Sequence, residues 1–260
     1  MLRDDIVAES SPLPVQIVPL TGLPEIVPGD NLARLLAEAV SAQKLVPRSG
    51  DVFAVAQKIV SKAEGRIVSL DAIKPSERAV QWAAEYRKDA RLIELVLRES
   101  ARIVRMERGV IISQTRHGFV CANAGVDLSN APAETALLLP EDPDRSAGLL
   151  QEQLSRAFGV HLAVIIADTF GRPWREGLVN VALGVAGMPA LVDYRDQYDT
   201  HGKTLHATII ATADELAAAA ELVMGKLNRI PAAMIRGVEL KGSPGAGRDL
   251  IRAPDRDLFR

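Results

Sequence analysis

The 260-residue chain contains one cysteine, Cys121, only 4% aromatic residues and a formal net charge of -2. A lone cysteine excludes a disulfide within the chain and a zinc site built from several thiolates. The nearly balanced charge leaves no excess of basic surface for nucleic acid or an anionic membrane. Apolar runs such as HLAVIIA are much shorter than a bilayer span, and the acidic start MLRDDIVAESSP lacks the regions of a secretory signal. We therefore expect a cytoplasmic protein without nucleic-acid or membrane partners.

Hydrophobic residues make up 48% of the chain and charged residues 25%, which is the composition of an ordinary folded protein. No repeat, low-complexity linker or sharp change of composition interrupts residues 14–241. We expect one folded unit there, with two interwoven lobes as an arrangement left open. Residues 1–13 have little pattern, and residues 242–260 are rich in glycine, proline and charge, so both are predicted to be loosely held arms.

The spacing of apolar residues predicts both strands and helices, with hairpins beside crossovers. Strands are expected at 15–20, 51–60, 102–106, 109–115, 118–124, 164–166, 177–187, 204–211 and 232–237. Helices are expected at 30–43, capped by Asp30, at 76–100, at 142–159, and at 212–226, opened by a capping box of Thr212 and Glu215. This order predicts an α+β fold with mixed sheets and flanking helices.

The first candidate for chemistry is the point where the buried run Val164 to Ile166 gives way to Asp168 and Thr169. Ligands of α/β proteins commonly lie at the carboxyl ends of such strands. A carboxylate and a hydroxyl suit a hard cation such as magnesium or manganese, which leaves coordination positions open for phosphate. The alternative is that Asp168 only caps a turn, and this stretch alone favours neither interpretation.

A second polar stretch, NAGVDLSN, places Asp127 and Asn130 in a glycine-containing loop after the strand that carries Cys121. Such residues are common in turns, so a purely local role is the stronger interpretation of this loop by itself. Together with Asp168, however, Asp127 would complete a two-carboxylate site, and two carboxylates plus phosphate hold a magnesium ion well. Cys121 is expected to be an inert core residue.

Two weaker signals come from lysines and from a stiff loop. Lys58 and Lys62 lie near the end of an expected strand, where a lysine can bind phosphate as a point charge, although surface lysines are common. The loop LTGLPEIVPGD could offer backbone groups to a nucleotide, but a tight strand-to-helix connection is the better interpretation. HGKT at 201–204 ends like a phosphate-binding loop, yet Gln197 stands where its first glycine is needed, so we exclude that motif.

Seven strings, taken in order, resemble the coenzyme F420:L-glutamate ligase family, also called F420-0:gamma-glutamyl ligases. They are GLPEI, VAQKIVSKAEGR, PSERA, RHGFVCANAGVDLSN, DTFGRPWREG, ADELAAAAELVMGK and the pair Arg236-Gly237. The resemblance spans about residues 15–237 with the family's order and spacing. It implies a GTP-dependent amide ligase that adds L-glutamate to the lactyl carboxylate of a deazaflavin precursor, F420-0, and then extends a gamma-linked polyglutamate tail.

By the same resemblance, GTP phosphorylates the acceptor carboxylate, and the glutamate amine displaces phosphate from the acyl phosphate. The family also implies a divalent metal, magnesium or manganese, a monovalent cation such as potassium, and an intertwined homodimer. Asp127 and Asp168 match ligands of a first metal, and Thr169 matches a ligand of a second. The matching nucleotide contacts are Leu23, Pro24, Glu25, Ile26, Gln57, Lys58, Lys62, Asn130 and the segment that begins with Met224, Gly225 and Lys226.

The chain departs from the family pattern at two places. Lys226 stands where some members have a glutamate that ligates the second metal, and an ammonium cannot ligate a cation. Either Thr169, phosphates and water hold that metal, or Lys226 neutralises phosphate charge in its place. The run QYDTHGKTL replaces an aspartate-leucine-tyrosine-glycine-arginine run of relatives, which leaves the acceptor contacts open.

Arg172 and Arg175 complete the predicted catalytic set with Lys62, Asp127 and Asp168. Their guanidinium groups either hold the anionic acceptor or the glutamate, or form internal salt bridges. Two other functions stay open: a metal-dependent amide ligase acting on another acceptor, and a non-catalytic GTP-binding protein of the same fold. Paired carboxylates that repel each other without metal argue against the latter.

Overall fold

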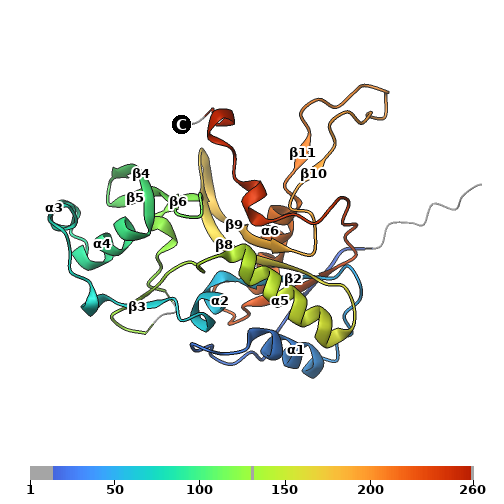
Figure 1. Ribbon diagram of the computed structural model, residues 1–260, viewed down its shortest axis with the longest axis horizontal. Helices are drawn as coiled ribbons and strands as arrows, with labels where there is room; N and C mark the ends of the chain where they lie inside the picture. Colours follow the sequence, from blue (N-terminus) through green and yellow to red (C-terminus); the bar gives the residue numbers. More distant parts are fainter. Residues whose placement is uncertain (1–13, 130–131, 259–260) are drawn as a thin grey trace, which may run out of the picture.

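The computed structural model describes residues 14–129 and 132–258, and a five-stranded sheet forms the centre of the larger lobe (Figure 1). In spatial order its strands are β1 (Gln16–Pro19), β12 (Ala232–Arg236), β2 (Val52–Ala56), β8 (Ala163–Arg172) and β9 (Arg175–Ala186). β2 and β8 are parallel, whereas the other neighbours are antiparallel. The predicted α+β fold with a mixed sheet is confirmed.

Helices cover both faces of this sheet. α1 (Leu32–Ala42) and α5 (Pro143–Phe158) pack on one face, and α6 (Thr212–Met224) packs on the other (Figure 1). Along β8, Val164 and Ile166 join the core under α1 and α5, whereas Ile165 and Ala167 join the core under α6. This alternation follows from the two-residue period of a strand, and burial on both faces explains the continuous apolar run.

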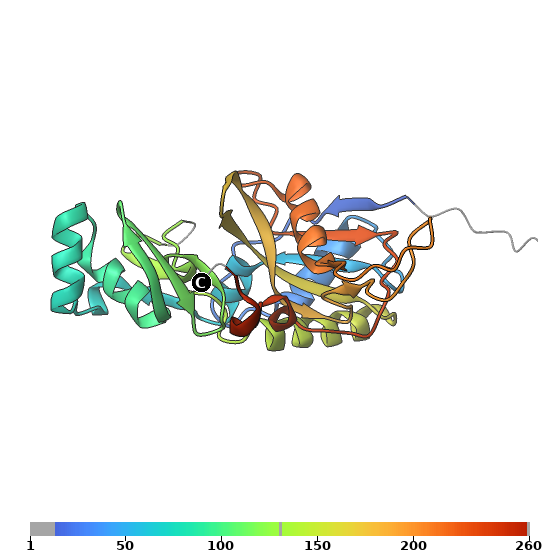
Figure 2. The same ribbon diagram turned by 90° about the horizontal axis from the view of Figure 1, so that it is seen from above.

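A second lobe lies beside the sheet along the long axis of the molecule (Figure 2). Its own core is formed by α3 (Glu77–Tyr86), α4 (Ala90–Glu99) and the sheet of β4 (Ser100–Glu107), β5 (Val110–Thr115) and β6 (Val120–Ala122). β3 (Ile67–Ser69) pairs with β7 (Thr135–Leu137) between the lobes. The strands predicted at 109–115 and 118–124 form a hairpin, because β5 and β6 are antiparallel neighbours.

The remaining elements are short. β10 (Val192–Asp193) and β11 (Ile209–Ile210) form the base of an arm that projects from the large lobe (Figure 1). Single turns of 3-10 helix are η1 (Leu70–Ala72), η2 (Asn123–Gly125), η3 (Gly247–Leu250) and η4 (Pro254–Arg256).

The described part of the C-terminal segment is packed at Gly247, although we expected a loosely held arm there. The Gly247 amide donates to Asp144 Oδ1 at 2.5 Å. A Cβ atom at this position would lie 2.3 Å from the Leu183 carbonyl oxygen. The glycine therefore permits a backbone approach to β9 that another residue would block.

Several predicted boundaries are wrong. The strand expected at 51–60 ends at Ala56 and continues directly into α2 (Gln57–Ala63). The helix expected at 76–100 is divided at Arg87, whose φ of 52° ends α3, and Asp89 caps α4. These are local backbone choices that hydrophobic spacing does not resolve.

Two predicted helix caps are also wrong, as is most of one strand. Asn31 caps α1 by accepting from the Arg34 amide, whereas Asp30 accepts from the Val27 amide in the preceding turn. α6 starts after Ala211 without a side-chain cap, so the capping box expected there is absent. Of the strand expected at 204–211, only β11 forms.

Candidate functional site

The strand that was expected to stop at Asp168 does not end there. β8 runs on to Arg172, turns through Trp174 and returns as β9. Within this hairpin Asp168 lies opposite Val181, and Thr169 lies opposite Asn180. Because residues opposite each other share a face and successive residues alternate, Asp168 and Thr169 point to opposite sides of the hairpin.

Asp168 lies just beyond the end of β2, the strand that runs parallel to β8. β2 ends at Ala56, which is paired with Ala167, and α2 starts at the next residue. Burial raises the pKa of Asp168 to about 6, against its ordinary 3.8. The negative charge of Asp127 acts in the same direction, while Lys58 and Lys226 act against it. Four charged groups from separate segments therefore act on one another at the end of β2.

Lys58 holds Asp127 in place. The Lys58 ammonium lies 2.7 Å from Asp127 Oδ2 and donates to Ser129 Oγ at 2.5 Å. The Ser129 amide donates to the other oxygen, Asp127 Oδ1, at 2.7 Å. Burial alone would raise the pKa of Asp127, but the hydrogen bonds from Lys58 and Ser129 outweigh it and lower the pKa below its ordinary value. Asp127 is therefore ionised and oriented.

The donor set fits a divalent cation that also binds phosphate. No group of three or more histidine, cysteine, aspartate or glutamate side chains is arranged for a metal among residues 14–129 and 132–258. Two carboxylates alone are appropriate for magnesium or manganese, which keep other positions for phosphate and water. The mutual repulsion of Asp127 and Asp168 is the kind of electrostatic strain that a cation relieves. Asn130, predicted to contact the nucleotide, lies outside the described residues.

The two segments predicted to bind nucleotide lie against each other. Lys62 on α2 is buried and forms an ion pair with Glu25 of the loop after β1. The Gly29 amide donates to the Ala63 carbonyl oxygen at 2.8 Å, and Ile26 is buried in the core under α1. The loop after β1 and α2 therefore lie against each other.

The other residues predicted in these two segments differ in their surroundings. Leu23 packs against the same core as Ile26, while Pro24 is exposed. Gln57 is buried, and its Oε1 accepts from Ser61 Oγ at 2.8 Å.

On the opposite side of the hairpin, Thr169 contacts Lys226. The Lys226 ammonium donates to Thr169 Oγ1 at 2.5 Å and lies 2.9 Å from Glu221 Oε1. Asn180 accepts from the Thr169 hydroxyl at 2.6 Å. Neither Asn180 nor Glu221 was predicted from the sequence. The sequence could have indicated Asn180 by its expected place across a hairpin from Thr169. For Glu221 the sequence offers only its spacing of five residues from Lys226.

The end of α6 positions Lys226. Met224 is buried in the core under α6, and Gly225 has a φ of 62° that ends the helix. A Cβ atom on Gly225 would lie 2.6 Å from Asn228 Nδ2. The chain therefore leaves α6 sharply, and the residue after the glycine reaches back towards β8.

The two arginines are not brought to the carboxylates. Arg172 Nη2 donates to the Glu176 carbonyl oxygen at 2.6 Å, which closes the turn of the hairpin. Arg175 pairs with Arg172 in the strand register and is exposed. Of the two predicted roles, an internal one describes Arg172 better, although its partner is a carbonyl and not a carboxylate.

A cavity of about 240 Å³ lies on the Asp168 side of the hairpin. Phe170, two residues after Asp168, forms one wall, and its ring meets that of Phe119 edge to face at 6.3 Å. The lining carries one positive charge, from Arg252, and two carboxylates, from Asp214 and Asp257. Nearby, burial raises the pKa of the Cys121 thiol to about 12, and the charge of Asp168 adds to this. Cys121 is therefore inert, as predicted.

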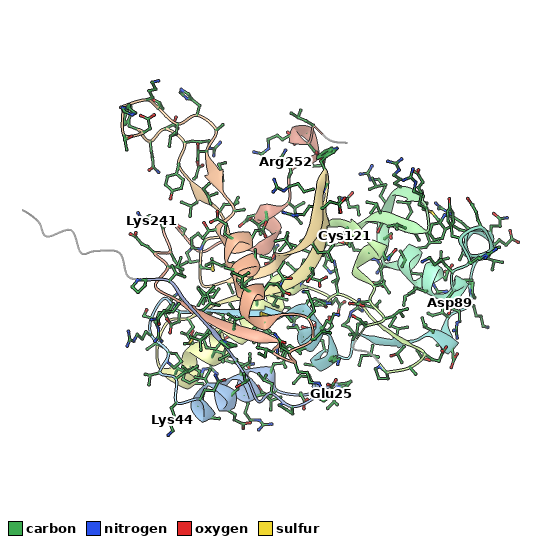
Figure 3. The ribbon with its side chains drawn as sticks, turned by 180° about the vertical axis from the view of Figure 1, so that it is seen from behind. Glu25, Lys44, Asp89, Cys121, Lys241 and Arg252 are labelled. Carbon is green, nitrogen blue, oxygen red and sulfur yellow. The ribbon has the colours of Figure 1, made fainter. Side chains whose placement is uncertain are left out.

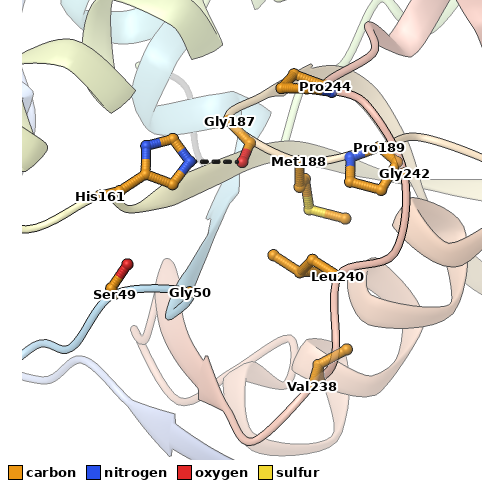
Figure 4. Close-up of a pocket in the computed structure, with 10 residues that line it drawn as sticks. All are labelled: Ser49, Gly50, His161, Gly187, Met188, Pro189, Val238, Leu240, Gly242 and Pro244. Atoms are coloured by element: carbon orange, nitrogen blue, oxygen red, sulfur yellow. Dashed lines mark hydrogen bonds between the residues drawn. The ribbon is translucent and has the colours of Figure 1, made fainter.

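A larger cavity, of about 330 Å³, lies at the other end of β8. It is lined by apolar groups such as Met188 and Leu240, and His161 hydrogen bonds to the Gly187 carbonyl oxygen at 3.0 Å (Figure 4). Its lining holds no lysine, arginine or carboxylate. It therefore offers no charged group to phosphate or to a divalent ion.

No helix in the described part of the chain has the length and apolar character needed to cross a bilayer.

Comparison with known proteins agrees with the resemblance that the sequence strings indicate. The family model of the F420-0:gamma-glutamyl ligases matches residues 22–237.

Similar proteins are found in several archaea. The coenzyme F420:L-glutamate ligase of Methanopyrus kandleri is 47% identical over 253 residues, which cover 95% of this chain and 98% of that protein. Those of Methanothermobacter thermautotrophicus and Archaeoglobus fulgidus are 45% and 38% identical, over 95% of this chain and 99% and 96% of the respective proteins. The chain belongs to the F420-0:gamma-glutamyl ligase family.

Proposed function

We propose that this protein uses GTP to join L-glutamate to the lactyl carboxylate of F420-0 and then lengthens a gamma-linked glutamate tail. The observation that carries the proposal is the convergence of Asp127, Asp168 and Lys58 beside the surface formed by α2 and the loop after β1. Phosphoryl transfer needs positioning and neutralisation of charge more than a protein nucleophile. These residues supply both.

The reaction proceeds in two balanced steps. A carboxylate oxygen of the acceptor attacks the γ-phosphorus of GTP, which gives an acyl phosphate and GDP. The neutral glutamate amine then attacks the acyl carbon, the C–O bond to phosphate breaks, and the phosphate leaves and takes up the proton that the nitrogen loses as the amide forms. A divalent ion held by Asp127 and Asp168 would supply charge neutralisation at the phosphates.

Lys58 has two roles in this proposal. Without nucleotide, the Lys58 ammonium neutralises Asp127 and offsets part of the negative charge near Asp168. When a cation takes over that task, the Lys58 ammonium is free to bind a phosphate oxygen. Lys62 is held against Glu25 and contributes a second fixed positive charge to the nucleotide surface.

We assign the aromatic part of the acceptor to the cavity beside the β8–β9 hairpin, where Phe119 and Phe170 offer ring edges and faces. Arg252 is the positive group of this lining, which also contains the carboxylates of Asp214 and Asp257. Potassium and a homodimer remain predictions from the resemblance, and a cytoplasmic location remains a prediction from the sequence.

The test is release of phosphate and GDP on mixing protein, GTP, manganese, F420-0 and L-glutamate, followed by the mass of the product. Release that needs both F420-0 and L-glutamate, with glutamate-mass additions, is the expected result. Asp168→Asn should abolish it. Asp142→Asn is the matched control, because Asp142 caps α5 and asparagine caps equally well.

Two other outcomes would replace the proposal. GTP binding without any turnover would favour a non-catalytic nucleotide-binding protein. Turnover with a different carboxylate would favour another acceptor, and the arm that carries QYDTHGKTL would be the segment to examine.

A further inference from the structure

The Lys226 ammonium is bound by oxygen atoms from three elements. Thr169 Oγ1 lies at 2.5 Å, Glu221 Oε1 at 2.9 Å and Asn180 Oδ1 at 3.4 Å. A lysine ammonium has three N–H donors, so these three oxygens satisfy all of them. The residues come from β8, β9 and α6, and only the folded hairpin beside the end of α6 brings them together.

The oxygen cage is fixed independently of Lys226. Asn180 Nδ2 donates to Glu221 Oε2 at 3.0 Å, which leaves Glu221 Oε1 for the ammonium. The Thr169 hydroxyl donates to Asn180 Oδ1, so the lone pairs of Thr169 Oγ1 are turned to the cation. Asn180 is buried, which anchors both contacts. Glu221 and Asn180 are thus positioning residues for whatever cation occupies the cage.

A hydroxyl, an amide oxygen and a carboxylate are the donors that hard divalent ions use. Here they surround a lysine, and an ammonium cannot ligate a metal. The second metal that the family resemblance implies at Thr169 and position 226 therefore does not fit the residues of this chain. The cage nevertheless holds a positive charge directly across β8 from Asp168, and that charge acts on Asp168.

We infer that the Lys226 ammonium is a resident cation that takes the place of a second divalent ion, so that the chain binds one divalent ion with each nucleotide. The inference rests on the proposed function for the identity of the nucleotide. Four residues set the number of divalent ions bound. Lys226 supplies the positive charge, and Thr169, Asn180 and Glu221 hold its ammonium in place.

The experiment counts manganese ions bound per chain in the presence of saturating GDP, by native mass spectrometry and by the electron paramagnetic resonance signal of free manganese. The wild-type chain should bind one ion. Lys226→Glu replaces the ammonium with a carboxylate among three existing oxygen donors, and it should bind two. Lys226→Gln offers a neutral oxygen and serves as the second variant if the glutamate variant does not fold.

Lys241→Glu is the matched control, because Lys241 is 59% exposed and pairs with Glu239 at 3.1 Å, while Lys226 is 57% exposed. Lys241 lies apart from the Cys121 end of the molecule (Figure 3). This control should keep one ion. Two ions in the wild-type chain, or no second ion in either folded Lys226 variant, would overturn the inference.

The count uses GDP and manganese and needs no turnover, so it is independent of the acceptor. A protein that binds one ion but makes no glutamate adduct would contradict the proposed function and leave this inference standing. A protein that makes the adduct but binds two ions would contradict this inference and leave the proposed function standing.

Discussion

Replacing Asp168 with asparagine should stabilise the metal-free protein while it destroys the metal site. Folding buries the Asp168 carboxyl and raises its pKa from 3.8 to about 6. The folded state therefore favours the protonated form, and stability falls as pH rises from about 4 to about 6. Above that range the native protein carries a charge at Asp168 that Lys58 and Lys226 offset only in part.

The size of the effect follows from the pKa change. The difference between 3.8 and about 6, at about 1.4 kcal/mol for each pH unit, corresponds to about 3 kcal/mol. Asparagine has nearly the same shape and can still accept from the Thr169 amide, so Asp168→Asn removes the charge and little else. For a chain of this size, about 3 kcal/mol raises the Tm by about 6–12 °C.

The assay is thermal and urea unfolding of protein freed of metal by a chelator, at pH 4 and pH 7.5. The variant should be more stable by up to about 3 kcal/mol at pH 7.5. At pH 4, where Asp168 is protonated in the native state, most of the difference should vanish. Added manganese and GDP should stabilise the wild type and not the variant, because a ligand stabilises only the state that binds it.

Asp51→Asn is the matched contrast, at the residue just before β2. Asp51 is 2% exposed, and its Oδ1 accepts from Arg236 Nε at 2.9 Å. Removing one partner of a buried pair costs about 3–5 kcal/mol, so this variant should be less stable. Lower stability of Asp168→Asn at pH 7.5, or an equal difference at both pH values, would refute the electrostatic account of Asp168.

Three further predictions concern other parts of the molecule. Iodoacetamide at pH 8 should leave Cys121 unmodified in the native protein and alkylate it in urea. The reason is that a thiol of pKa about 12 forms about a thousandth of the thiolate that an ordinary cysteine forms. Rapid labelling of the native protein, detected by mass, would contradict the burial of Cys121. Gly184→Ala should destabilise the protein by about 3 kcal/mol in urea unfolding, because the new Cβ would lie 2.1 Å from the Pro143 carbonyl oxygen; a neutral result would mean that α5 is not fixed on β9. Arg175→Ala should weaken saturation by F420-0 or L-glutamate without changing the Tm, because the exposed Arg175 guanidinium was predicted from the sequence to hold an anionic substrate; unchanged saturation curves for nucleotide and both substrates would contradict that role.

The types of residue at the site could be predicted, because their chemistry shows in the sequence. Asp127, Asp168 and Lys58 each follow a run of apolar residues, and their charges indicate metal and phosphate. Their contact could not be derived from spacing, since it depends on β2 ending at the residue paired with Ala167. Resemblance to the family supplied that pairing.

The cage around Lys226 shows what the sequence hides. Asn180 reaches Thr169 through the register of the β8–β9 hairpin, and Glu221 reaches Lys226 because Gly225 ends α6 sharply. Neither relation leaves a periodic signal. The extension of β8 past Asp168 was missed for a related reason: a polar residue in a strand marks a change of environment, not the end of the ladder.

Short local elements were the least predictable. α2 follows β2 with no glycine or proline between them, so apolar spacing alone could not separate strand from helix. Arg87 breaks the expected long helix in a left-handed conformation that glycine would have signalled. Both misses concern backbone geometry that tertiary packing decides.

The central claim is that GTP activates the carboxylate of the acceptor beside Asp127 and Asp168. It is tested most directly with F420-0 that carries ¹⁸O in its lactyl carboxylate, incubated with GTP, manganese and L-glutamate, followed by mass analysis of the released phosphate. One ¹⁸O atom is expected in the phosphate released by the first glutamate addition to each labelled F420-0, and none in the phosphate from later additions to the tail. A first addition that forms a normal amide but releases unlabelled phosphate would contradict the claim.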